Sequence, residues 1–116
     1  MHFMITLSLL LNVAILVPVC LGLLADAAWA KDVYGVRTQA RDILLSIYVA
    51  IAAVSIILIF ADRPQAVGAL LLVQIIYKIT TPFTVRTVKN PVVISNLLIA
   101  AFHSITLIAT PSLRGN

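Results

Sequence analysis

The fold of this chain is decided by residues 43–61, which read ILLSIYVAIAAVSIILIFA and contain no charged side chain. The hydrocarbon core of a bilayer is about 30 Å thick, and an α-helix needs roughly 20 apolar residues to cross it. The run IILIF at residues 56–60 does not alternate apolar with polar residues, as a strand of a membrane β-barrel does. The stretch therefore predicts a membrane-spanning α-helix.

Three further apolar segments of similar length lie on either side of it. Phe3–Leu24 and Pro91–Ala109 contain no Lys, Arg, Asp or Glu, and Gln65–Val85 contains one charged residue, Lys78. The connections at 62–64 and 86–90 are short, and short turns make neighbouring helices antiparallel. With Ile43–Ala61, these segments predict an all-α membrane protein, a single polytopic domain over residues 1–116 built as an antiparallel bundle of four transmembrane helices with short loops.

The composition excludes several other classes of protein. Hydrophobic residues make up 62% of the chain and charged residues 10%, with a mean hydropathy of +1.13. Soluble domains are about half apolar and a quarter charged, so an ordinary soluble domain, a disordered chain and a disulfide-stapled secreted module are all excluded. The net charge is +4, but the basic residues are scattered along the span ends and form no basic face for nucleic acid.

The distribution of Lys and Arg predicts the orientation, because cytoplasmic loops carry the excess of these residues. The side opposite the first and third connections has only Arg63 and Arg114. The first and third connections contain five basic residues, which we call the topology charges: Lys31, Arg37, Arg41, Arg86 and Lys89. We therefore predict that the first and third loops are cytoplasmic and that both termini lie on the outer side. Short loops without glycosylation or organellar signals favour a bacterial cytoplasmic membrane.

The first connection, residues 25–42, allows two interpretations. Ala28-Trp29-Ala30 has the A-x-A form of a signal-peptidase site, so the first span could be a cleaved signal. However, Met1-His2-Phe3 carries no Lys or Arg and the apolar run is longer than that of a usual signal peptide, so we expect the span to be retained. In that case Ala25–Tyr34 is expected to lie along the headgroups as a short helix, with Trp29 and Tyr34 as interfacial anchors.

Four polar residues inside the third and fourth spans form a candidate intramembrane site: Gln74, Lys78, Asn96 and His103. Polar and ionisable groups within spans are costly, so each is a candidate functional residue. Gln74 and Lys78 are four residues apart on one helix face, and Asn96 and His103 are seven apart on the next. Counting about 1.5 Å of rise per residue from the shared turn puts Lys78 level with Asn96 and Gln74 level with His103. We predict that these two pairs approach one another.

This stripe has a functional and a structural interpretation. It is either an ion or proton path, or a small polar site with His103 as the titrating member, or else a set of packing residues. In the structural interpretation, Lys78 reaches the headgroups and His103 hydrogen-bonds a neighbouring helix. Asn12 in the first span is likewise expected to make an interhelical hydrogen bond, and Ser46, Ala50, Ala53 and Ser55 form small-residue faces of the second span.

Reactive constellations are scarce in the sequence. The chain has four Asp, no Glu and one cysteine, with no paired carboxylates in a span and no C-x-x-C or H-x-x-x-H spacing for a metal. The four glycines are isolated, so no phosphate-binding loop is present. Ser104 and Thr106 are expected to point away from the face of His103. We predict no catalytic residues, no cofactor and no metal, and we do not expect an enzyme.

One part of the chain resembles the small G-type subunit of multisubunit Na+/H+ antiporters. The resemblance covers roughly residues 22–85 and rests on Asp32-Val33-Tyr34 with Arg37 in the first loop, followed by Thr80-Thr81-Pro82 near the end of the third span. The chain lacks the histidine of that family's loop and adds a fourth span, so no residue roles are carried over.

The sequence is compatible with two functions. The first is a non-catalytic accessory or structural subunit, or a scaffold, of a membrane complex, with the bilayer and either other membrane subunits or a second copy as partners. The alternative is a small oligomeric transporter of ions, protons or solutes, or an antiporter-subunit-like protein, that uses the polar stripe on the third and fourth helices.

Overall fold

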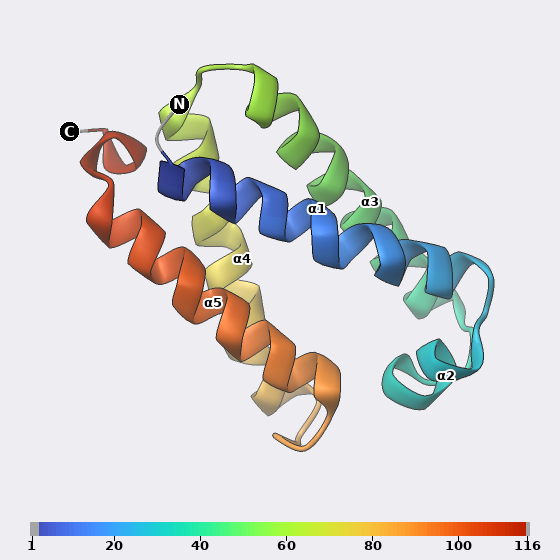
Figure 1. The fold of residues 1–116 in the computed structure, drawn as a ribbon. Coiled ribbons are helices and arrows are strands. Elements are labelled where there is room, and N and C mark those ends of the chain that lie inside the picture. Colours follow the sequence, from blue (N-terminus) through green and yellow to red (C-terminus); the bar gives the residue numbers. More distant parts are fainter. Residues whose placement is uncertain (1–2, 116) are drawn as a thin grey trace.

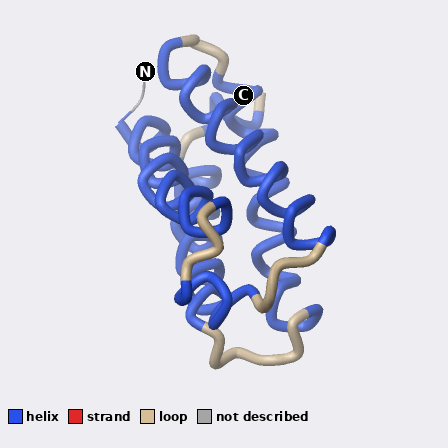
Figure 2. Tube along the Cα trace, turned by 90° about the vertical axis from the view of Figure 1, so that its right-hand side faces the viewer, coloured by secondary structure: helices blue, strands red, loops and turns tan. Residues whose placement is uncertain are grey.

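The structure, a computed structural model, describes residues 3–115 and is all-helical. The elements in chain order are α1 (Phe3–Leu24), α2 (Ala28–Tyr34), α3 (Gln39–Phe60), α4 (Pro64–Thr84), α5 (Pro91–Ala109) and the 3-10 turn η1 (Pro111–Arg114). Figure 2 shows that loops occur only as the connections between helices. The predicted all-α fold with four long apolar helices packed antiparallel is confirmed. Met1, His2 and Asn116 lie outside the described residues.

The ends of the helices follow local chemistry. α3 begins at Gln39, four residues before the predicted span, because Thr38 Oγ1 accepts a hydrogen bond of 3.1 Å from the backbone N–H of Arg41 and caps the helix. α5 begins at Pro91 after Asn90, whose Oδ1 accepts the Val92 N–H at 2.8 Å. Proline at the first helical position loses no hydrogen bond, so this start is well defined.

The bundle consists of two helical hairpins. α1 packs along α3, and α4 packs along α5 (Figure 1). The hairpins lie close together at the end where α1 begins and where η1 lies, and they diverge toward α2 and the α4–α5 loop. The four long helices are each sufficiently long and apolar to cross a bilayer, so the protein is a small multi-pass membrane protein with four candidate spans.

Two groups of buried apolar residues hold the hairpins together. One lies at the converging end, where Ile5 and Leu9 of α1 meet Leu58 of α3, Val67 and Leu71 of α4, and Leu113 of η1. The other has members from α1, α2 and α3, among them Leu16, Leu23, Ala30 and Tyr48, and the partly buried Leu70 and Tyr77 of α4 pack against it. Large apolar side chains point outward from every long helix, and Phe60 is 86% exposed. This is the arrangement expected of a surface that faces lipid.

The C-terminal turn is docked on the bundle at a glycine. A Cβ atom built on Gly68 of α4 would collide with the backbone carbonyl of Leu113 in η1. Glycine at this position therefore lets the backbone of η1 approach α4, and the Leu113 side chain is buried beside Val67 and Leu71. The segment after Pro111 is thus packed against α4 through Leu113.

Arg41, counted from the sequence as a topology charge, is buried in the structure. Its side chain donates to Asp26 Oδ1 at 2.7 Å, to the Gly35 carbonyl at 2.9 Å and to the Leu23 carbonyl at 3.3 Å. These bonds tie the end of α1 and the end of α2 to the first turn of α3. The Arg41 guanidinium also holds the pKa of the Asp26 carboxylate below its ordinary value of 3.8.

Candidate functional site

Five buried polar side chains from three helices form one hydrogen-bonded cluster around His103 of α5. His103 Nε2 lies 2.8 Å from Asn12 Oδ1, and His103 Nδ1 lies 3.2 Å from Ser8 Oγ, both on α1. Asn12 Nδ2 donates to Ser55 Oγ of α3 at 3.1 Å, and Ser8 Oγ lies 2.8 Å from Thr106 Oγ1 of α5. We call Ser8, Asn12, Ser55, His103 and Thr106 the polar cluster. It links the two hairpins.

The bonding pattern of the polar cluster assigns the histidine tautomer. Because the Asn12 amide nitrogen donates to Ser55, its Oδ1 is the atom that faces His103 and can only accept. His103 Nε2 therefore carries a hydrogen, and a neutral ring accepts from the Ser8 hydroxyl through Nδ1. His103, Ser8, Ser55 and Thr106 have no exposed surface, so the cluster is sealed within the bundle.

The predicted partner of His103 differs from the observed ones. Both ring nitrogens are engaged with α1, and the fully buried Gln74 side chain forms no hydrogen bond within residues 3–115. The expected contact between Gln74 and His103 is therefore not formed as a hydrogen bond. The expectation for Thr106 was also wrong, because residues three apart share a helix face and Thr106 lies on the same buried face as His103. The interhelical role of Asn12 is confirmed.

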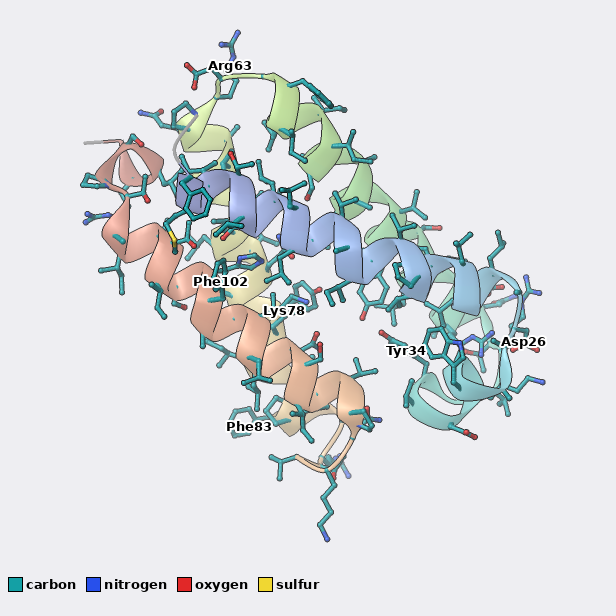
Figure 3. The ribbon with its side chains drawn as sticks, viewed as in Figure 1. Asp26, Tyr34, Arg63, Lys78, Phe83 and Phe102 are labelled. Carbon is teal, nitrogen blue, oxygen red and sulfur yellow. The ribbon has the colours of Figure 1, made fainter. Side chains whose placement is uncertain are left out.

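The predicted approach of Lys78 to Asn96 is confirmed. Lys78 Nζ donates to Asn96 Oδ1 at 3.1 Å, and the ammonium also lies 4.8 Å from the centroid of the Tyr77 ring. Lys78 is only 4% exposed and Asn96 only 5%. The lysine thus points into the protein, between the two hairpins (Figure 3), and its ammonium does not reach out of the bundle.

Two adjoining hollows lie beside this pair, where the hairpins diverge. One has a volume of about 180 Å³ and is lined by residues that include Leu16, Trp29, Lys78 and Asn96. The other has a volume of about 320 Å³ and includes Tyr77, Thr81 and Asn90. Tyr34, Tyr48, Asn96, Val33 and Val92 line both hollows. We call the two hollows together the inter-hairpin cavity.

Aromatic side chains form the wall of the cavity next to α2 and α3. Tyr34 packs edge-on against Tyr48 with ring centroids 6.1 Å apart, and the Tyr34 hydroxyl donates to the Tyr48 oxygen at 3.4 Å. Burial raises the pKa of the Tyr34 phenol above its usual range. Tyr34 was expected to be an interfacial anchor, and in the structure its side chain is half-buried against Tyr48. The indole ring of Trp29 packs against Gly22, where an added Cβ would collide with it.

The remaining topology charges are exposed, and a hydrogen bond connects the two loops that carry them. Asn90 Nδ2 donates to the Val33 carbonyl at 2.8 Å, so the α4–α5 connection adjoins α2. Lys31, Arg37, Arg86 and Lys89 are exposed around this end of the bundle, and Arg63 and Arg114 are exposed at the other.

A stripe of small residues on α3 faces outward. Ser46, Ala50 and Ala53 occur at intervals of four and three residues, so they share one face of the helix, and all three are exposed. Ser55 points the other way, into the polar cluster. Of the four small residues predicted to form packing faces, Ser55 therefore lies inside and bonds α1, and the other three form an outer face that no residue among 3–115 buries.

Comparison with known proteins identifies no relative, since no family model, curated protein or solved structure matches the chain.

Proposed function

We propose that the protein is a non-catalytic accessory or structural subunit of a membrane assembly. The observation that carries this proposal is the outward face formed by Ser46, Ala50 and Ala53 on α3. Small residues let helix backbones approach closely in lipid, where no hydrophobic effect drives their association. A partner helix, from another membrane protein or a second copy of this chain, would pack on this face.

The inner polar groups support the same proposal. The polar cluster uses its hydrogen-bonding groups between helices of the same chain, and both nitrogens of His103 are engaged. The loops described in residues 3–115 are short, so most of the surface available to a partner belongs to the spans. A partner would therefore contact this protein mainly within the membrane.

The test is native mass analysis of the tagged protein extracted in a mild detergent, with identification of what co-purifies. We expect a stoichiometric membrane partner or a homo-oligomer. The variant Ala50→Leu adds bulk to the outward face and should release the partner. Ile47→Phe adds as many carbon atoms about a quarter turn away on the exposed surface of α3 and should not release it. Free monomer alone from the wild-type protein, or equal retention by both variants, would contradict the proposal.

A second candidate, a small transporter that builds its path by oligomerising, is favoured by one observation. Lys78 and Asn96 lie buried between the hairpins and line the inter-hairpin cavity. The test is ion flux in liposomes under a pH or voltage gradient. Flux that is lost in Lys78→Met would support transport, and absence of flux in the wild-type protein would remove this candidate.

For the location, we propose the bacterial cytoplasmic membrane, with α2 and the α4–α5 loop on the cytoplasmic side, both termini outside and α1 retained in the mature protein. The exposed Lys31, Arg37, Arg86 and Lys89 support this orientation. Retention of α1 is supported by Ile5, Leu9, Leu16 and Leu23, which are buried against the other helices.

A further inference from the structure

Lys78 is a buried cation with a neutral hydrogen-bond partner. An ammonium has three donors, and one of them is directed to Asn96 Oδ1. The only other attraction described for it is the Tyr77 ring. None of the residues that line the two hollows is Asp or Glu. A charge buried in a span without an opposite charge is costly, so this site favours an anion beside the lysine.

The inter-hairpin cavity provides room for such an anion and for an apolar body attached to it. Its hollows of about 180 and 320 Å³ are far larger than the roughly 30 Å³ that one water occupies in the liquid. Lys78 and Asn96 supply polar groups at one place, while Ile15, Leu16, Val19 and Val92 make much of the remaining wall apolar. A site with a few polar groups in an apolar wall is the usual form of a small-molecule pocket.

The larger hollow contains a further unused polar atom. The Tyr77 hydroxyl is buried and has no hydrogen-bond partner among the described residues, and Tyr77 lines this hollow beside Asn96. Buried polar groups in proteins are almost always bonded, so an unbonded one in a cavity indicates a missing partner. The Lys78 ammonium in the smaller hollow and the Tyr77 hydroxyl in the larger one are each able to donate to an acceptor, and a carboxylate has acceptor oxygens only.

We propose that the inter-hairpin cavity binds a fatty acid, with its carboxylate at Lys78 and its acyl chain along the apolar wall. The carboxylate supplies the negative charge that the buried ammonium lacks. The acyl chain contributes by packing against the apolar wall and by filling the space where the hairpins diverge. A free fatty acid suits this cavity better than an anionic phospholipid, because its head is a single carboxylate with no glycerol and second acyl chain to bury.

Trp29 provides a direct probe of this site. It is the only tryptophan of the chain, and it lines the smaller hollow together with Lys78. Bromine quenches indole fluorescence at short range, so an ω-brominated undecanoate bound in the cavity should quench Trp29 saturably. The measurement uses the full chain in nanodiscs of neutral phospholipid, with the methyl ester of the same brominated acid as the uncharged control.

We expect the acid to quench at concentrations about tenfold lower than the methyl ester, because the ester does not carry the charge that pairs with Lys78. Lys78→Met should weaken binding of the acid about tenfold, and Lys78→Arg, which keeps the charge, should stay within about threefold of the wild type. Lys89→Met removes the same charge at an exposed position and should leave quenching unchanged.

Two results would overturn the role of Lys78, and a third would overturn the choice of a free fatty acid as the occupant. One is equal affinity of the wild-type protein for the acid and the ester, which decides the question even if Lys78→Met fails to fold. The other is equal affinity of folded Lys78→Met and wild type for the acid. Displacement of the acid by an equal concentration of anionic phospholipid, but not by neutral phospholipid, would reject the free acid as the occupant.

Discussion

His103 Nε2 and Asn12 Oδ1 lie 2.8 Å apart, although the two residues are 91 positions apart in the chain. This hydrogen bond crosses from the α4–α5 hairpin to the α1–α3 hairpin. Asn12 continues the link to Ser55, so a single asparagine connects three helices. Polar contacts of this kind take the place of the hydrophobic effect in joining helices within lipid.

Replacing Gln74 by an apolar residue should affect stability differently from replacing Asn12. Its side chain is fully buried, and neither amide atom forms a hydrogen bond within residues 3–115. Gln74→Met removes an unsatisfied polar group at nearly constant volume, so we expect unchanged stability or a gain of about 1 kcal/mol. Asn12→Leu breaks two bonds and should lose about 1–2 kcal/mol. Reversible unfolding in mixed micelles measures both. A loss of stability in Gln74→Met would mean that the amide is bonded in the folded protein.

Gly68→Ala should loosen the C-terminal turn. The added Cβ collides with the Leu113 carbonyl, and backbone cannot move aside as a flexible side chain can. We expect a cost of about 1–3 kcal/mol and faster proteolysis after Pro111. Ala69→Val, at the neighbouring exposed position, is the matched control and should behave as the wild type. Equal cleavage rates of the two variants would argue against the docked position of η1.

Arg41→Met should destabilise the first connection. It removes three hydrogen bonds that a buried guanidinium makes to α1, to the end of α2 and to Asp26, at a cost of about 1–3 kcal/mol. Arg37→Met removes an exposed ion pair with Asp42, which is worth at most about 1 kcal/mol. Thermal unfolding of the two variants gives the comparison, and a loss in Arg37→Met as large as that in Arg41→Met would contradict the buried role.

The pair of Arg41 and Asp26 also predicts a pH dependence. The folded pKa of Asp26 is depressed below 3.8 by the Arg41 hydrogen bond, so the stability that this carboxylate contributes is present above the unfolded pKa. It is lost as the pH falls through the folded pKa. The stability difference between wild type and Asp26→Asn should therefore be constant near neutral pH and should shrink as the pH falls below about 4. A difference that grows on acidification would have the wrong sign.

The proposed orientation can be measured by cysteine labelling in intact cells. In a Cys20→Ser background, Ser112→Cys in η1 should react with a membrane-impermeant maleimide added outside. Val88→Cys in the α4–α5 loop should react only after the cells are opened, because we place this loop in the cytoplasm. Both positions are exposed and uncharged, so neither change alters the balance of basic residues. The reverse pattern would invert the orientation.

The sequence predicts those features that depend on positions close together in the chain. Hydropathy and length locate the spans, and the short α4–α5 turn sets the depth at which Lys78 meets Asn96. The partners of His103 lie on α1 and α3, and hairpin geometry does not determine how α5 is rotated toward them. By residue type and position in the first connection, Arg41 cannot be told from an exposed topology charge. Two of its hydrogen-bond partners, Leu23 and Asp26, lie at or just after the end of α1, and only the folded chain brings them to Arg41. The inter-hairpin cavity depends on the divergence of the two hairpins, which no local pattern encodes.

The central claim is that the polar cluster holds the two hairpins together, and a double-mutant cycle between Asn12 and His103 tests it most directly. Unfolding free energies are measured for Asn12→Ala, His103→Ala and the double variant. In a control cycle Ser104→Ala replaces His103→Ala, because the Ser104 hydroxyl donates to the Ala100 carbonyl of its own helix. We predict a coupling of about 0.5–1.5 kcal/mol between Asn12 and His103 and none in the control cycle. Strict additivity of Asn12→Ala and His103→Ala would contradict the claim.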